Sequence, residues 1–231
     1  MGTVISNKKV ADGIGLLVIE SSRGGNPGQF YMLRAWDNYP LLSRPISIFD
    51  NDENTISFLY QVVGEGTRRF QELRAGDKLH MEGPFGNGFP GVEGSLALVG
   101  GGIGIAPLFY MAKAVPNADV YLGFSQQPYL TDAFLEVSRS LHVEVGGTIL
   151  SSIDFTEYDK VMVCGPHGML KAASDKHKEH GRPHHVFVSL ENRMACGVGA
   201  CLVCSVKCRD GRKKACTDGP VFPVEEVVFN D

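Results

Sequence analysis

The sequence predicts a multi-domain protein that combines α+β and α/β architecture in three parts. Residues 1–92 contain short β-type stretches separated by turn residues, a pattern typical of a small antiparallel β-barrel. Residues 93–190 alternate strand-like with helix-like stretches, which is typical of an α/β domain with a parallel sheet. Residues 191–231 hold five of the six cysteines, and we expect them to form a metal-binding segment.

The individual elements follow from runs of β-branched and aromatic residues and from the Gly, Pro and Asp residues between them. In the first part we expect strands over 13–20, 29–34, 45–49, 55–63 and 78–82. In the second part we expect strands over 96–99, 120–124, 143–145, 161–164 and 186–190. Helices are expected over 107–114, 131–140 and 167–177.

Composition excludes some classes of partner. The 231 residues carry 22 basic and 26 acidic side chains, and the resulting net charge of −4 favours neither nucleic acid nor an anionic membrane. Residues 1–10 lack the apolar core of a signal peptide, so we expect a cytoplasmic protein with reduced thiols. The uncharged run 94–112 is long enough to span a membrane, but its glycines and Pro107 indicate a buried strand, a turn and a helix instead.

The cysteine pattern indicates an iron-sulfur cluster. Cys196, Cys201 and Cys204 follow the spacing Cys-x4-Cys-x2-Cys, which with a distant fourth cysteine is typical of plant-type [2Fe-2S] ligation. The fourth ligand is either Cys208 or Cys216, and we favour Cys216 because an Asp-Gly turn before it would return the chain to the loop. The alternatives are incidental thiols or a zinc site, although a zinc ribbon requires a second Cys-x2-Cys pair.

Two motifs in the first part suggest a phosphate-bearing cofactor. Arg44, Pro45, Ile46 and Ser47 place a guanidinium that can pair with a pyrophosphate and a hydroxyl that can reach a flavin ring. The alternative is an ordinary edge strand with a surface arginine. The run 64–67, Gly-Glu-Gly-Thr, offers backbone N–H groups and a hydroxyl to a phosphate, and its alternative is a plain turn.

Two further motifs lie in the second part. Gly100, Gly101, Gly102 and Gly104 follow a predicted strand and open a predicted helix, where backbone can approach a dinucleotide pyrophosphate. Residues 125–127 supply no acidic side chain for a ribose, so the usual Rossmann argument for NAD fails, and the lack of basic residues there favours NADH over NADPH. The run 164–166, Cys-Gly-Pro, ends a predicted strand, where it either meets a ligand or contains a buried structural cysteine.

The chain also has Pro-Gly-Gln-Phe at 27–30. Together with the motifs at 44–47, 64–67, 100–107 and 164–166, and in this order along the chain, it resembles the ferredoxin reductase family over nearly the whole length. The tail is more specific. Ser-Leu-Glu-Asn-Arg-Met-Ala-Cys-Gly at 189–197 and Asp-Gly-Pro-Val-Phe at 218–222 resemble the electron-transfer subunits of NAD-linked (type B) dihydroorotate dehydrogenases. The segment between Cys204 and Cys216 looks short for that family, and Cys208 is an unmatched thiol within it.

The resemblance implies an oxidoreductase subunit with three cofactors. It would move electrons from the FMN of a partner catalytic subunit through a [2Fe-2S] cluster and FAD to NAD+, in pyrimidine biosynthesis, as part of a hetero-oligomer. We expect no acid-base catalyst among its side chains. The implied sites are FAD contacts at Arg44, Pro45, Ile46, Ser47, Leu59, Tyr60, Gln61, Gly66 and Thr67, NAD(H) contacts at Gly100, Gly101, Gly102, Gly104, Cys164, Gly165 and Pro166, and cluster ligands at Cys196, Cys201, Cys204 and Cys216.

Two other functions remain open from the sequence. A reductase of the same architecture would serve another partner, such as a sulfide dehydrogenase, a hydrogenase or a ferredoxin-NADP transhydrogenase. A non-enzymatic iron-sulfur or zinc module is the other alternative, and it would leave the flavin motifs unexplained.

Overall fold

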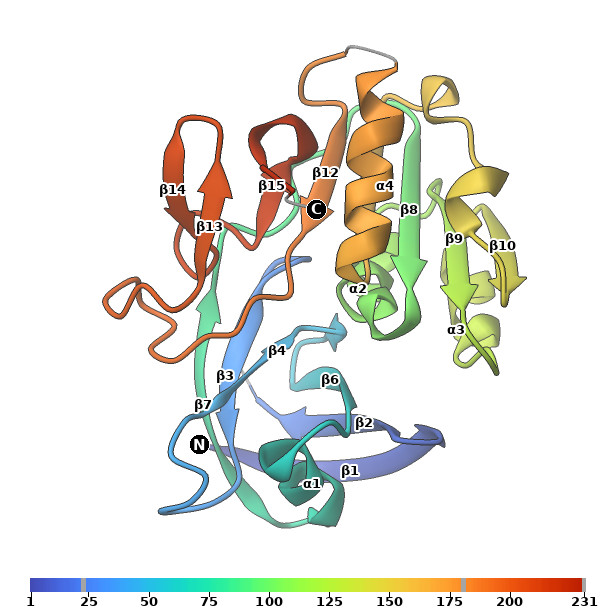
Figure 1. Ribbon diagram of the computed structural model, residues 1–231. Coiled ribbons are helices and arrows are strands. Elements are labelled where there is room, and N and C mark those ends of the chain that lie inside the picture. Colours follow the sequence, from blue (N-terminus) through green and yellow to red (C-terminus); the bar gives the residue numbers. More distant parts are fainter. Residues whose placement is uncertain (22–23, 180–181, 230–231) are drawn as a thin grey trace.

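A computed structural model describes residues 1–21, 24–179 and 182–229 of the chain. It contains a curled antiparallel sheet, a mostly parallel sheet flanked by helices, and a small hairpin (Figure 1). The first sheet has the strand order β4-β3-β7-β1-β2-β6-β5. Its strands are β1 (Gly2–Ala11), β2 (Ile14–Glu20), β3 (Phe30–Arg34), β4 (Arg44–Ser47), β5 (Asp50–Asn51), β6 (Thr55–Gln61) and β7 (Lys78–Phe85).

The curled sheet encloses its own apolar core. Alternate residues of β7 are buried, as expected for a strand with one face towards a core. The residues after β4 bring the two ends of the sheet together, because Ile48 N–H donates to Gln29 (3.0 Å) and Phe49 N–H donates to Ser57 (2.8 Å). Helix α1 (Glu65–Glu72) contributes Phe70 to this core. The predicted barrel is confirmed, and β1 is a strand that sequence analysis missed.

The second sheet has the strand order β10-β9-β8-β11-β12-β15, with β15 antiparallel to β12 and the other pairs parallel. Its strands are β8 (Leu96–Gly101), β9 (Asp119–Phe124), β10 (Ser140–Val145), β11 (Lys160–Cys164), β12 (Val186–Ser189) and β15 (Val221–Pro223). The flanking helices are α2 (Ala106–Ala114), α3 (Thr131–Val137) and α4 (His167–Lys178), with 3-10 turns η1 (Gly102–Ile105), η2 (Ile149–Ser152) and η3 (Phe155–Glu157).

Strand β8 occupies the centre of this sheet, and all six of its residues are buried. The chain moves from β8 through β9 to β10 on one side, and β11 and β12 then lie on the other side. The strand order therefore reverses between β8 and β11. In open α/β sheets this switch point, at the carboxyl ends of the strands, is where ligands bind.

Most predicted elements of the second sheet are confirmed, with small shifts at their ends. One prediction is wrong: the helix expected over 131–140 ends at Val137. Ser138 follows it in an extended conformation and turns its hydroxyl back to the Phe134 carbonyl (2.8 Å), which ends the helix before β10 begins at Ser140.

The C-terminal residues are joined to both sheets. Strands β13 (Ser205–Cys208) and β14 (Gly211–Lys214) form the expected hairpin around the Asp-Gly turn, whereas β15 extends the six-stranded sheet and is followed by a 3-10 turn, η4 (Val224–Glu226). The Gly219 carbonyl accepts a hydrogen bond from Asn87 N–H (2.7 Å), just after β7. The predicted domain boundaries after residues 92 and 190 stay predictions. The pairing of β15 with β12 shows that the C-terminal segment shares a sheet with the α/β domain.

Within the described ranges, no helix is long and apolar enough to cross a membrane.

Candidate functional site

Four cysteines of the C-terminal segment form two pairs. The Cys204 and Cys216 sulfurs lie 3.2 Å apart and both residues are buried, while the Cys201 thiol donates a hydrogen bond to Cys196. Outside the gaps at 22–23, 180–181 and 230–231, no three Cys, His, Asp or Glu side chains form a group able to hold a single metal ion. Two pairs of thiols are what a diiron cluster requires, since each iron takes two protein ligands.

The loop that carries the first three cysteines points backbone N–H groups towards sulfur. Hydrogen bonds from the N–H groups of Val198 and Cys201 lower the pKa of the Cys196 thiol to about 6. Gly197 and Gly199 make this possible, because their φ angles of 73° and 79° are left-handed conformations that glycine tolerates. Successive N–H groups in such a loop form an anion-binding concavity, which suits the negative charge of a thiolate-ligated cluster.

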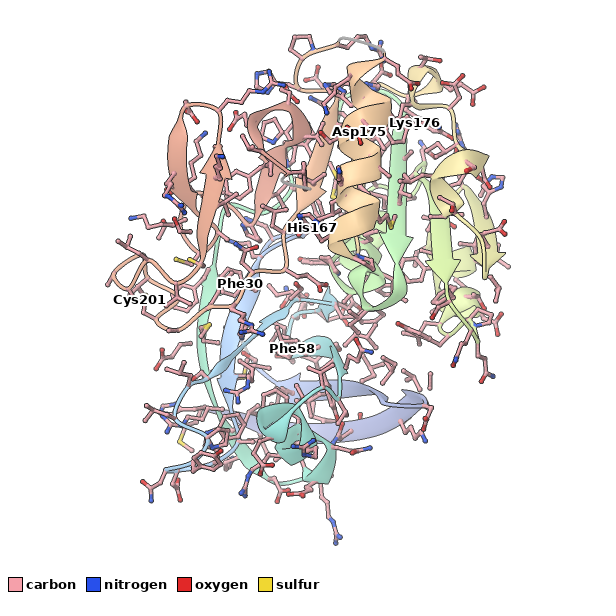
Figure 2. The ribbon with its side chains drawn as sticks, in the orientation of Figure 1. Phe30, Phe58, His167, Asp175, Lys176 and Cys201 are labelled. Atoms are coloured by element: carbon pink, nitrogen blue, oxygen red, sulfur yellow. The ribbon has the colours of Figure 1, made fainter. Side chains whose placement is uncertain are left out.

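The inner pair of thiols has a different environment. Burial, with the neighbouring Cys204 thiol, raises the pKa of Cys216 to about 11. The outer pair lies closer to solvent, and Figure 2 shows Cys201 on the loop at the left edge of the molecule. The site is therefore accessible on the Cys201 side and enclosed on the side that faces the protein.

Cys208 lies away from these four thiols. It ends strand β13, and four extended residues place it roughly 13 Å from Cys204 along the strand. Its side chain is buried in the core, and burial raises the pKa of its thiol. The hairpin instead returns the chain to Cys204, where the Ala215 N–H donates to the Cys204 carbonyl (3.0 Å). The geometry thus supports Cys216 as the fourth ligand.

Arg44 and Gly66 are neighbours in space. A methyl group on Gly66 would lie 2.5 Å from Arg44 Nε and 2.9 Å from the ring of Trp36, so only glycine allows this contact. The Arg44 guanidinium also lies 5.3 Å from the Trp36 ring centroid and donates to the Leu42 carbonyl. Gly66 is in the first turn of α1, where backbone N–H groups have no partner within the helix. A guanidinium beside a helix N-terminus fits a pyrophosphate.

The other predicted flavin contacts have varied environments. Pro45, Ile46 and Ser47 are half-buried on the edge strand β4. Thr67 is buried, and its hydroxyl accepts from the N–H groups of Val63 (2.9 Å) and Gly64 (3.1 Å), so this hydroxyl caps the helix.

The three predicted flavin contacts at the end of β6 have different surroundings. Leu59 packs between the two sheets, whereas the Tyr60 side chain is buried in the barrel core and donates to Asn7 (3.0 Å). Gln61 is exposed and lines a pocket. Of these three side chains, only that of Gln61 is open to a ligand, and Tyr60 offers its backbone.

The two nucleotide motifs meet at the switch point of the six-stranded sheet. A methyl group on Gly104 would lie 2.5 Å from the Cys164 carbonyl oxygen, and one on Gly101 would lie 2.6 Å from the Met169 sulfur. Gly100 packs on Ile105 and Leu108, so it serves the strand-to-helix turn. The glycines therefore let the loop after β8 pack closely against the end of β11.

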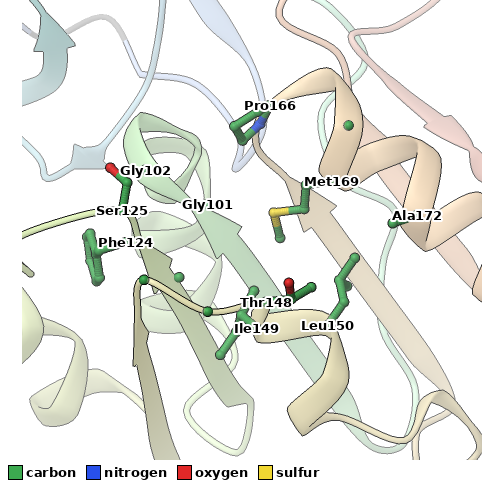
Figure 3. Close-up of a pocket in the computed structure, with 14 residues that line it drawn as sticks. Gly101, Gly102, Phe124, Ser125, Thr148, Ile149, Leu150, Pro166, Met169 and Ala172 are labelled. Carbon is green, nitrogen blue, oxygen red and sulfur yellow. The ribbon is translucent and has the colours of Figure 1, made fainter.

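Two pockets open on this junction. The first, of about 620 Å³, lies at the ends of β8, β9 and β11, and its lining contains no charged side chain (Figure 3). The second, of about 500 Å³, shares Gly101, Gly102 and Pro166 with the first and reaches the barrel at Gln61. The two pockets therefore adjoin at the loop after β8, and the second extends from there to the barrel.

Cys164 is not exposed in either pocket. Its side chain is buried and burial raises the pKa of the thiol well above its usual range, so the thiol is neutral at pH 7. The next two residues, Gly165 and Pro166, line the second pocket. The cysteine is therefore a buried structural residue, and the contact of Gly165 and Pro166 with a nucleotide stays a prediction.

Sequence analysis did not select Glu191 and Trp36. Glu191 lines the second pocket just after β12, where burial raises the pKa of its carboxyl group. The pKa of nearby Tyr129 rises to about 12, because of burial and then the Glu191 charge. The position of Glu191 at a strand end was a usable signal, whereas nothing local places Trp36 beside Arg44.

The cluster loop lies against the barrel strand next to the flavin motif. A methyl group on Gly197 would lie 2.9 Å from Met32 Cγ and 3.3 Å from the Phe85 ring. Met32 on β3 is paired directly with Pro45 on β4. One strand spacing, about 4.8 Å, therefore separates the strand under the cysteine loop from the strand with Arg44 and Ser47.

Comparison with known proteins agrees with this arrangement. Residues 191–228 match the model of the iron-sulfur cluster binding domain of dihydroorotate dehydrogenase B. Among solved structures, an NADH-dependent reduced ferredoxin-NADP oxidoreductase has a TM-score of 0.88 at 30% identity, over 99% of this chain and 90% of that one. The Plasmodium falciparum ferredoxin-NADP+ reductase shares the fold, with a TM-score of 0.66 at 14% identity over 81% of this chain and 95% of that one.

Curated relatives cover nearly the whole chain. The dihydroorotate dehydrogenase B (NAD(+)) electron transfer subunit of Clostridium acetobutylicum is 43% identical over 99% of this chain and 96% of its own length. The subunit of the same name from Clostridium perfringens is 38% identical over 99% of this chain and 97% of its own length. The chain belongs to the family of dihydroorotate dehydrogenase B electron transfer subunits.

Proposed function

We propose that this chain carries electrons from the FMN of a partner dihydroorotate dehydrogenase catalytic subunit to NAD+, in pyrimidine biosynthesis. The chain is an NAD(H)-dependent flavin and iron-sulfur oxidoreductase subunit. Its cofactors are a [2Fe-2S] cluster, FAD and NAD(H). When bound, FAD exchanges a hydride with nicotinamide and single electrons with a cluster, which neither of the other two groups does alone.

The observation that carries the proposal is the packing of Gly197 against Met32, the strand partner of Pro45. This contact supports a short route between the cysteine loop and the flavin motif. The second pocket connects Gln61 at the end of β6 with the nucleotide loop at Gly102. In this proposal single electrons reach the flavin from the cysteine loop, and hydride transfer takes place at the second pocket.

Each cofactor has proposed contacts in the chain. Cys196 and Cys201 would hold one iron, and Cys204 and Cys216 the other. Arg44 and the first turn of α1 would offset the pyrophosphate charge of FAD, and the glycines after β8 would let the nucleotide approach. The side chains bind and orient the cofactors, and we assign none of them as an acid-base catalyst.

The outer face of the cysteine loop suits a protein partner. Beside the exposed Cys201, the side chains of Val198, Leu202 and Val203 are 58%, 63% and 54% exposed. Neighbouring apolar side chains exposed on one loop mark an interaction site. We assign this face to the catalytic subunit in a hetero-oligomer, because electrons must enter where the thiols approach the surface.

We also propose a division of the chain into an FAD-binding barrel (1–92), an NAD-binding domain (93–190) and a cluster-binding segment (191–231). The protein acts in the cytoplasm, where a reducing environment keeps thiols available for iron.

The visible spectrum of the purified chain tests the cofactor assignment. After reconstitution with FAD, iron and sulfide, we expect flavin bands together with the broad absorption of a [2Fe-2S] cluster. A chain that takes up iron but no flavin would contradict the reductase assignment and favour an iron-sulfur module.

One other function has specific support. The structural similarity to the ferredoxin-NADP oxidoreductase, at a TM-score of 0.88, favours a reductase that serves a different partner. The protein that copurifies with the chain from its native cell distinguishes the two. A dihydroorotate-oxidising flavoprotein supports the first proposal, and a ferredoxin-linked enzyme supports the second.

A further inference from the structure

We propose that Lys113 is a positioning residue, which clamps the α/β domain onto the barrel through Asp50 and Asp52 and thereby fixes the gap where nicotinamide meets flavin. This inference rests on the FAD and NAD(H) sites of the proposed function. It concerns contacts that lie outside those sites.

The clamp joins two distant parts of the chain. Lys113 Nζ lies 3.0 Å from both carboxylate oxygens of Asp50 and 2.7 Å from Oδ1 of Asp52. Lys113 is in the last turn of α2, and the two carboxylates lie on β5 and just after it. The Lys113 side chain is 38% exposed and that of Asp50 is 19% exposed, so water only partly screens this ion pair.

Two more residues of α2 contact the barrel beside this clamp. The Phe109 ring stacks on the Phe49 ring, with centroids 4.4 Å apart and planes 9° apart. The Tyr110 hydroxyl donates to the Gly25 carbonyl (3.1 Å). Figure 1 shows α2 at the end of the parallel sheet that faces β4 and β6. The helix is therefore the element that joins the two sheets on this side.

The same helix supports the nucleotide loop. Its first residue, Ala106, directly follows η1, the turn that contains Gly102 and Gly104. On the barrel side, Phe49 and Asp50 follow Ser47 of the flavin motif by two and three positions. A short rigid helix thus connects the loop proposed to hold the nucleotide with the segment next to the strand proposed to hold the flavin.

The shape of the second pocket depends on this connection. Ile14 and Gln61 line it from the barrel, while Gly102, Gly165 and Glu191 line it from the other sheet. Any change in the angle between the two sheets therefore changes the distance across this pocket. Because a misplacement of about 1 Å can slow a reaction on the order of 100-fold, even a weak clamp in this place affects hydride transfer.

The size of the effect follows from the exposure of the pair. A partly exposed ion pair contributes modestly and is weakened by salt. Reversing the charge at Lys113 replaces attraction by repulsion among three carboxylates. We expect the Lys113→Glu variant to show flavin reduction by saturating NADH that is about five- to twentyfold slower, with nucleotide and FAD affinity within about twofold of the starting protein.

A charge swap supplies the matched rescue. In the Lys113→Glu, Asp52→Lys double variant one attractive pair is restored with its signs exchanged, while Asp50 still faces the introduced carboxylate, so we expect partial recovery. The control is Lys178→Glu, which breaks an exposed ion pair with Asp175 (2.6 Å) near the end of α4. Two quantities are measured for each protein: the rate of flavin reduction by anaerobic stopped flow, and the radius of gyration from small-angle X-ray scattering without nucleotide.

The proposal expects Lys113→Glu to be slower and more expanded, the double variant to recover part of both losses, and the control to change neither quantity. Unchanged rate and scattering in Lys113→Glu would overturn the clamp, as would a double variant that is no faster and no more compact than Lys113→Glu. Neither measurement needs the catalytic subunit, so a wrong partner assignment leaves the result intact. A chain that binds no FAD contradicts the proposed function, while the scattering comparison still tests the clamp.

Discussion

The Cys204 and Cys216 sulfurs lie 3.2 Å apart, although twelve positions separate the two residues in the sequence. The β13–β14 hairpin produces this contact, because Ser205 pairs with Lys214 at its open end. Cys208 lies at the closed end of the same hairpin, opposite Gly211. The hairpin therefore separates the two candidates for the fourth ligand in space.

The first test uses this separation. We expect Cys216→Ser to lose the cluster, because one iron would keep a single protein thiolate, and Cys208→Ser to retain it. Iron and sulfide content, with the visible spectrum, measure the outcome. Since a hydroxyl buried at position 208 costs about 1 to 3 kcal/mol, Cys208→Ala serves as a control for stability. Cluster loss in both Cys208 variants, with retention in Cys216→Ser, would reverse the assignment.

The second test concerns Arg44. Removing a charge-assisted contact to the FAD pyrophosphate costs about 1.5 to 3 kcal/mol, so Arg44→Ala should weaken FAD binding roughly tenfold or more. Gly66→Ala should act in the same direction, because its methyl group would displace the guanidinium. Fluorescence titration of the apoprotein with FAD gives the affinities. Arg68→Ala, on the exposed side of the same helix, is the control, and equal FAD affinity in Arg44→Ala would make Arg44 an ordinary edge-strand residue.

The third test concerns the stability of the parallel sheet and its dependence on pH. Asp119, with an 8% exposed side chain, accepts from Arg139, Ser140 (2.6 Å) and Tyr158 (2.9 Å). The Arg139 hydrogen bond, followed by those from the two hydroxyls, lowers the pKa of Asp119 to about 2 from 3.8. A carboxyl group whose pKa is lower in the folded than in the unfolded chain stabilises the fold at every pH above its unfolded-state pKa. This contribution is lost as the pH falls from about 4 towards 2.

Asp119→Asn should therefore lower the free energy of unfolding by about 2 kcal/mol at pH 7. The difference from the starting protein should hold down to about pH 4 and narrow below it. Urea titrations at several pH values measure both quantities. A difference that stays constant down to pH 3 would show that the carboxylate charge is not what stabilises this site.

The fourth test concerns the partner face. Leu202→Glu places a charge in the exposed apolar group beside Cys201, and we expect it to weaken assembly with the catalytic subunit at least tenfold. Reduction of dyes by NADH should stay unchanged, because that reaction does not use this face. Val143→Glu is the control, since Val143 is also exposed but lies on β10, at the opposite side of the molecule (Figure 1). Equal loss of assembly in both variants would contradict a specific face at the cysteine loop.

Local sequence signals were sufficient for much of this description. The Cys-x4-Cys-x2-Cys spacing and the Asp-Gly turn predicted a loop and a returning hairpin, and both features depend on residues close in sequence. The fold class and the family resemblance are confirmed. The glycine loop after β8 and the Cys-Gly-Pro motif were predicted separately, and the strand order explains why they meet.

Other features depend on contacts between distant residues and had no local signal. Trp36 lies beside Arg44 because the loop before β4 folds back, and Lys113 meets Asp50 because two sheets pack together. The pairing of β15 with β12 also had no local signal, because a strand of three residues is too short to show a sequence pattern. Tyr60 and Thr67 stay predicted flavin contacts, but no local pattern indicated that the Tyr60 side chain packs in the barrel core or that the Thr67 hydroxyl caps a helix.

The central claim is a division of labour: this chain handles the nicotinamide, and its partner handles dihydroorotate. The most direct measurement compares two activities of the reconstituted chain, alone and after addition of the catalytic subunit. Alone, the chain should reduce dyes with NADH and leave dihydroorotate unchanged, and with the catalytic subunit it should reduce NAD+ at the expense of dihydroorotate. Oxidation of dihydroorotate by the isolated chain, or no NAD+ reduction by the assembled pair, would contradict the account.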